Sequence, residues 1–74
     1  MNRDPGDIEA DVRILLGALA ADNDPAAFQA LLALSGYLGE CLGRSARTLA
    51  ESQSWGDVAS VAGTTKQAAW SRWH

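Results

Sequence analysis

The sequence has 74 residues, of which 47% are hydrophobic, and a formal net charge of −3. This length allows one small domain, the hydrophobic fraction argues against a disordered chain, and the single cysteine excludes an intrachain disulfide. Cys41 and His74 alone do not make a zinc site, and no apolar run is long enough to span a membrane. The N-terminus also lacks the pattern of a signal peptide. We therefore expect a cytoplasmic protein without a metal or cofactor.

The first predicted helix runs from about Pro5 to Ala21. Asp4 is a candidate N-cap, and Pro5 stands in the first turn, where a helix tolerates proline best. Asp22 and the two residues after it predict the end of the helix. One apolar stripe is formed by residues at helical spacing, namely Ile8, Val12, Leu15, Leu16 and Leu19.

The second predicted helix begins at Pro25, with Asp24 as its cap, and continues to about Ser52. It is long for so small a protein. Its main apolar stripe consists of Phe28, Leu31, Leu34, Leu38, Leu42 and Leu49, with Cys41 at the edge.

A stripe of small residues follows another side of this helix. Its members are Gly36, Gly39, Gly43, Ala46 and Ala50. Each glycine in a helix interior costs about 1 kcal/mol relative to alanine, so the three glycines need an explanation. We favour close approach of another helix, either the first helix or the same helix of a second chain, over a kink or break near Ser35-Gly36. The predicted dimer interface comprises Leu31, Leu38, Gly36, Gly39 and Gly43.

Residues 54–74 predict two short helices joined by a tight turn. Ser54 caps the first helix together with Asp57, and Gly63 ends it in a left-handed conformation. Thr64 or Thr65 caps the second helix. The residues expected to pack the two helices together are Trp55, Val58, Ala59, Gly63, Ala69 and Trp73. The whole chain therefore predicts an all-α fold of about four helices, with a long second helix and a C-terminal helix-turn-helix.

Residues 54–73 resemble the helix-turn-helix of small actinobacterial transcription regulators. The matching residues are Ser54, Trp55, Asp57, Val58, Ala59, Gly63, Thr65, Lys66, Gln67, Ala68, Ala69, Arg72 and Trp73. The departures are Thr64 in the turn, Gly56 in the first helix and the bulky Trp70 in the second. Residues 1–53 carry no comparable resemblance. The resemblance implies a bacterial, sequence-specific DNA-binding regulator that reads the major groove with the helix starting near Thr65.

This resemblance assigns roles to polar side chains of residues 54–74. The expected base contacts are Lys66, Gln67 and Ser71. The expected phosphate contacts are Ser54, Thr65 and Arg72, extended by Arg44 and Arg47.

Each role has an alternative. Lys66 can be a solvated charge, Gln67 can cap its own helix at Thr64, and Arg72 can pair with Asp57 or Glu51. Trp70 fits a core edge, a thymine-methyl contact or a dimer contact.

Charge divides the chain into an acidic and a basic part. Residues 1–43 carry two basic and seven acidic side chains, a net charge of −5, and residues 44–74 carry four basic and two acidic side chains, a net charge of +2. Such a distribution would orient the basic end toward DNA. We expect residues 1–53 to form a helical core and dimerisation segment, and residues 54–74 the helix-turn-helix, in one compact domain.

The expected partners are double-stranded DNA and a second copy of the chain, since dimers read two half-sites. No membrane and no small-molecule ligand are expected. An alternative is a protein-interaction module that binds a sigma factor, an antitoxin partner or polymerase. An enzyme is not expected, because no paired carboxylates, Cys/His arrangement or phosphate-binding loop is visible.

Overall fold

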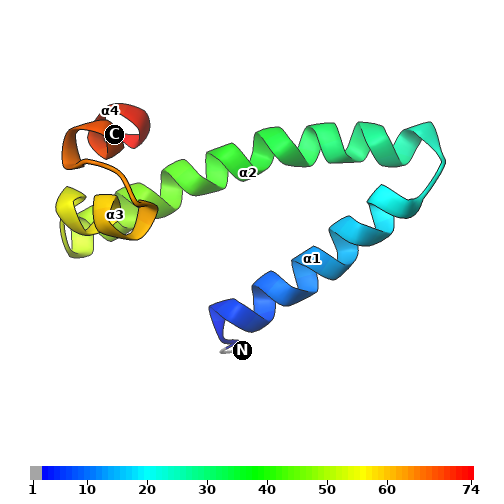
Figure 1. Ribbon diagram of the computed structural model, residues 1–74, viewed down its shortest axis with the longest axis horizontal. Helices are drawn as coiled ribbons and strands as arrows, with labels where there is room; N and C mark the ends of the chain where they lie inside the picture. The colour runs from blue at the N-terminus through cyan, green and yellow to red at the C-terminus, as the bar shows by residue number, and fades with distance from the viewer. Residues whose placement is uncertain (1–2) are drawn as a thin grey trace. The chain divides into compact units, whose positions relative to one another are not determined.

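The computed structural model describes residues 3–74, and all regular secondary structure in them is helical (Figure 1). The helices are α1 (Pro5–Ala21), α2 (Pro25–Ser52), α3 (Trp55–Ala62) and α4 (Lys66–Trp73). The predicted all-α class, the four helices and the long second helix are thus confirmed. Within these residues, no helix combines the length and the apolar composition that crossing a membrane requires.

The helices fall into two compact units, with the boundary between Ser35 and Gly36. Helix α2 runs through this boundary without interruption, so the break considered near Ser35-Gly36 is absent. The first unit contains α1 and the start of α2, and the second contains the rest of α2 with α3 and α4. This boundary is defined by contacts within each unit. The predicted boundary at residue 53 separates segments by their expected function, and it stays a prediction.

Helix α1 begins at the position that the sequence predicts. Asp4 occupies the N-cap position in an extended conformation, and its side chain makes no capping hydrogen bond. Its backbone carbonyl accepts the first hydrogen bonds of the helix, from the N–H groups of Asp7 (3.0 Å) and Ile8 (3.1 Å). The N-cap position predicted for Asp4 is therefore confirmed, although no side-chain capping bond forms. Pro5 has no backbone N–H, so it leaves no donor without an acceptor in the first turn.

The start of α2 is capped as the sequence predicts. The backbone N–H of Ala26 donates to a carboxylate oxygen of Asp24 at 2.9 Å. The N–H of Asp24 donates in turn to the carboxylate of Asp22, also at 2.9 Å. These two aspartates therefore bind donors that the loop and the first turn of α2 would otherwise leave without partners.

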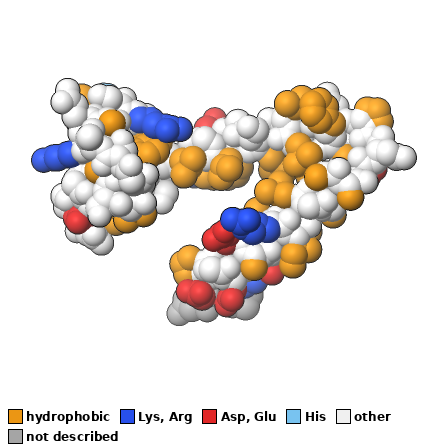
Figure 2. All heavy atoms as spheres, viewed as in Figure 1, with side chains coloured by type: hydrophobic (Ala, Val, Ile, Leu, Met, Phe, Trp, Pro, Cys, Tyr) orange, Lys and Arg blue, Asp and Glu red, His pale blue; other side chains and the backbone are white. Residues whose placement is uncertain are grey.

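The first unit has almost no core of its own. Among residues 3–35 the one buried side chain is Ala27. Hydrophobic side chains gather on the surface of α1 and of the start of α2 (Figure 2). The large exposed ones are Ile8, Val12, Ile14, Leu15, Phe28, Leu32 and Leu34. Helices stabilised by tertiary packing need an apolar face that is covered, and this unit does not cover its own.

The second unit has a small core made of small side chains. Ala46 of α2, Val58 and Ala59 of α3 and Ala69 of α4 are buried together. Leu49, Ala50, Trp55 and Trp73 pack around them and are partly buried. Because alanines allow helix axes to approach closely, the two indole rings at the edge supply most of the bulk.

Local hydrogen bonds define both ends of α3. The N–H of Asp57 donates to the Ser54 hydroxyl at 3.1 Å, which begins α3. Gly63 ends α3 with φ 71° and ψ 36°, in the left-handed region. The N–H of Gly63 donates to the carbonyl of Ser60 and that of Thr64 to the carbonyl of Ala59. This pair of bonds is the Schellman motif, which satisfies carbonyls that the helix end leaves free.

Candidate nucleic-acid interface

Helix α4 presents one side to the core and another to solvent. Ala69 is fully buried against α3, and Trp73, one turn later, is partly buried. The predicted base contacts Lys66, Gln67 and Ser71 are all exposed. At about 100° per residue, Gln67 and Ser71 point away from Ala69, and Lys66 stands at the flank. The three side chains are therefore free to meet a ligand along α4.

Two alternatives for these residues are not formed in the structure. Within residues 3–74 the side chain of Gln67 makes no hydrogen bond, so it does not cap α4 at Thr64; Thr65 does so by accepting from the N–H of Ala68 at 3.1 Å. Both ion pairs of the described residues lie within or before α1. Arg72 therefore has no carboxylate partner there.

The hydroxyls of the predicted phosphate contacts Ser54 and Thr65 are engaged in capping. Thr65 accepts a backbone hydrogen bond. Ser54 accepts from the N–H of Asp57 and also donates to the Asp57 carboxylate at 2.8 Å. A carboxylate beside Ser54 repels a phosphate, so Ser54 is the weakest of the predicted phosphate contacts.

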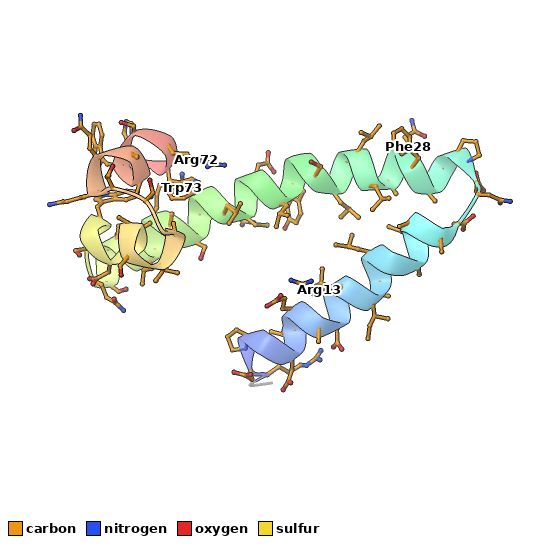
Figure 3. The ribbon with its side chains drawn as sticks, viewed as in Figure 1. Arg13, Phe28, Arg72 and Trp73 are labelled. Carbon is orange, nitrogen blue, oxygen red and sulfur yellow. The ribbon has the colours of Figure 1, made fainter. Side chains whose placement is uncertain are left out.

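The other predicted phosphate contacts converge on one groove. Arg44 and Arg47 of α2 and Arg72 of α4 line a cavity of about 480 Å³, together with Gly39, Glu40, Gly43 and Trp73. Figure 3 shows Arg72 and Trp73 at the end of α4, beside α2. We call this cavity the arginine groove. Arg44 and Arg72 are 28 positions apart in the sequence. The packing of the end of α4 against α2 brings the three arginines together.

Neutral groups hold each guanidinium of the arginine groove. Arg47 donates to the backbone carbonyl of Trp73 at 2.9 Å, and Arg72 lies over the Trp73 ring, 5.1 Å from its centroid. Arg44 donates to the Tyr37 hydroxyl at 3.4 Å and to the Cys41 thiol at 3.6 Å. The hydrogen bonds to Cys41 and to Tyr37 raise the pKa of Arg44 above its ordinary value.

The two halves of the predicted dimer interface lie on different sides of α2. At about 100° per residue, Leu31 and Leu38 share one side, and the three glycines lie about 80–160° around the helix from them. Leu31 is partly buried and Leu38 is exposed. A Cβ built on Gly36 or Gly39 meets no atom within 4 Å, so within residues 36–74 no helix approaches these two glycines.

Gly43 differs from the other two glycines of this stripe, because it is buried. A Cβ added to it would lie 3.1 Å from Nη1 of Arg47, the far end of a flexible side chain. Gly39 and Gly43 instead line the arginine groove. The cost of about 1 kcal/mol for each glycine is thus not offset by helix packing inside this unit.

Two features of this region are absent from the sequence-based predictions. The ring of Trp70 stacks on that of His74, with centroids 3.9 Å apart and planes 3° from parallel. The spacing of four along a helix is a signal that could have indicated this pair. The bond from Arg47 to the Trp73 carbonyl had no such signal, since the partners are 26 residues apart.

No cluster of three or more potential metal ligands occurs in the part of the chain that the structure describes. Comparison of the chain with protein-family models, with curated proteins and with solved structures found no match. The functional argument therefore rests on the residues and geometry given above.

Proposed function

We propose that the protein is a sequence-specific DNA-binding transcription regulator, in which α3 and α4 form a helix-turn-helix and α4 reads the major groove. The observation that carries the proposal is the two-sided character of α4. Ala69 is buried against α3. Lys66, Gln67 and Ser71 are exposed, and within residues 3–74 their side chains make no hydrogen bond or ion pair.

The local geometry supports this role for α3 and α4. The helices meet at Ala59 and Ala69, and the left-handed Gly63 turns the chain between them. Thr65 fixes the start of α4. In a helix-turn-helix, residues near the start of the second helix reach base edges, and here those residues are Lys66 and Gln67. Gln67 has the amide that pairs with adenine in bidentate fashion.

Dimerisation is part of the same proposal. A single helix-turn-helix contacts few base pairs, and two-fold dimers read two half-sites about one helical turn apart. The first unit supplies a surface for a second copy, because most of its large apolar side chains are exposed and Ala27 is the one buried residue among residues 3–35. We place the second copy on the leucine side of α2, with Leu31 and Leu38, and on the apolar stripe of α1.

The test is selection of genomic DNA fragments by the purified protein, followed by the variant Gln67→Ala. We expect discrimination at one base position in each half-site to fall by about 1–3 kcal/mol, since the bidentate contact is lost. The matched control is Gln29→Ala, which removes an exposed glutamine from α2. Equal site preference of Gln67→Ala and the parent protein would remove Gln67 from the set of base contacts.

A protein-interaction module is the second candidate, and one observation favours it. Val61 of α3 is 82% exposed and Trp70 of α4 is 48% exposed, so both helices carry apolar side chains on their surface. Binding to random-sequence duplex DNA at increasing salt separates the two functions. A DNA-binding protein loses affinity steeply through counterion release, whereas a protein-binding module has little affinity at any salt.

A further inference from the structure

The arginine groove contains three guanidinium groups and one carboxylate. Arg44, Arg47 and Arg72 line it, and Glu40 is the acidic side chain among its lining residues. Each guanidinium is held by a neutral carbonyl, hydroxyl, thiol or aromatic ring. The groove therefore combines fixed donors with positive charge that no ion pair in residues 3–74 compensates. Such a combination is complementary to an anion with several oxygen acceptors.

The floor of the groove explains two of the glycines in α2. Gly39 and Gly43 line the cavity, and a side chain at Gly39 would meet no protein atom within 4 Å. The missing side chains thus leave open space beside the guanidinium groups.

We propose that the arginine groove binds a phosphate group. In the DNA complex this group is a phosphodiester of the DNA backbone at the edge of the major groove. The second part rests on the proposed function. Arg72 lies about 140° around α4 from Gln67, so the groove is on a different side of α4 from the predicted reading side. This is the arrangement expected of a contact that positions the protein, because phosphate contacts set register while base edges carry sequence information.

One variant removes charge from the groove without touching Arg47, which also holds the end of α4. Arg44→Gln with Arg72→Gln should reduce the slope of log affinity against log salt by about 0.9 for random-sequence duplex, the contribution of one phosphate. The control, Arg3→Gln with Arg13→Gln, removes the same charge from outside the groove and should leave the slope unchanged.

A second variant fills the groove without changing charge. Gly39→Leu should weaken duplex binding several-fold while the helix remains folded, since leucine favours helix and meets no atom at this position. Gly36→Leu is the control, because Gly36 has the same open surroundings but does not line the groove. If both glycine variants weaken binding equally, the glycines serve an interface between chains and the groove is not the site.

A parallel titration with inorganic phosphate, followed by amide chemical shifts of Gly39 and Gly43, separates the sources of the phosphate. Chemical-shift changes in the parent that disappear in the arginine variant, together with the smaller salt slope of duplex binding by that variant, support both parts of the proposal. Chemical-shift changes on addition of phosphate, without any duplex binding by the parent, support phosphate binding in the groove and overturn the proposed function. Duplex binding that all groove variants retain at the parent's slope overturns the groove and leaves the proposed function intact.

Discussion

Glycine has opposite consequences at two positions of the second unit. At Gly63 the backbone has φ 71° and ψ 36°, a conformation in which an L side chain is strained. At Gly39 the backbone is helical and the space beside it is open, so a side chain costs nothing sterically and adds helix propensity. The same residue type therefore stabilises the turn and destabilises the helix.

This contrast gives a prediction at the scale of single residues. Gly63→Ala should lower the free energy of unfolding by about 1–2 kcal/mol, because alanine is disfavoured in the left-handed region. Gly39→Ala should raise it by up to about 1 kcal/mol. Thermal denaturation followed by circular dichroism measures both. If Gly63→Ala left the free energy of unfolding unchanged, the turn would have relaxed to another conformation.

At the scale of elements, the contact between α3 and α4 depends on side chains no larger than alanine. Ala59 and Ala69 are buried at this contact, and Ala69 has no exposed surface. The Schellman motif at Gly63 fixes where α3 ends, and the cap at Thr65 fixes where α4 begins. The helices therefore cannot slide to accommodate a larger side chain. Close packing here is what holds the exposed side of α4 outward.

Ala69→Leu should therefore destabilise the protein by about 1–3 kcal/mol through overpacking. Ala68→Leu, one position earlier and exposed, is the matched control and should change the stability by less than about 0.5 kcal/mol. Denaturant unfolding monitored by tryptophan fluorescence reports on both, because Trp55 and Trp73 border the same core. If the two leucine variants were equally stable, the contact between α3 and α4 would not be a fixed one.

At the scale of the whole molecule, most large apolar side chains remain exposed. In residues 3–74 the buried core consists of four alanines and Val58. A domain of this size gains little from its own core, and it has no disulfide to add stability. We propose that a second copy buries part of these exposed apolar side chains.

The corresponding prediction concerns oligomeric state. Leu38→Glu should convert the dimer to a monomer, because it places a charge on the leucine side of α2, where Leu38 is 59% exposed in the single chain. Ile14→Glu is the control, since Ile14 is 70% exposed but lies on the opposite side of α1 from the apolar stripe. Sedimentation equilibrium measures the mass of each variant. A parent protein that is monomeric at every concentration would overturn the predicted dimer.

Much of the fold could be predicted because its determinants are local. The bounds of α1 and α2, the caps at Asp24 and Ser54 and the turn at Gly63 each depend on residues a few positions apart. The N-cap position of Asp4 was predicted in the same way, although its side chain makes no capping hydrogen bond.

The surroundings of the glycines in α2 could not be predicted. Sequence spacing placed Gly36, Gly39 and Gly43 on one side of a helix and suggested a helix as their neighbour. What lies beside Gly39 and Gly43 is instead decided by where the end of α4 meets α2, through contacts such as that from Arg47 to Trp73.

The sequence by itself determined the helices, their ends and which side chains of α4 share a side, because a helix is periodic and its caps are local. Only the tertiary structure decided that Arg44, Arg47 and Arg72 share one groove and that most large apolar side chains of the first unit remain exposed. Those outcomes depend on contacts between residues far apart in the chain, and helical periodicity carries no information about such contacts.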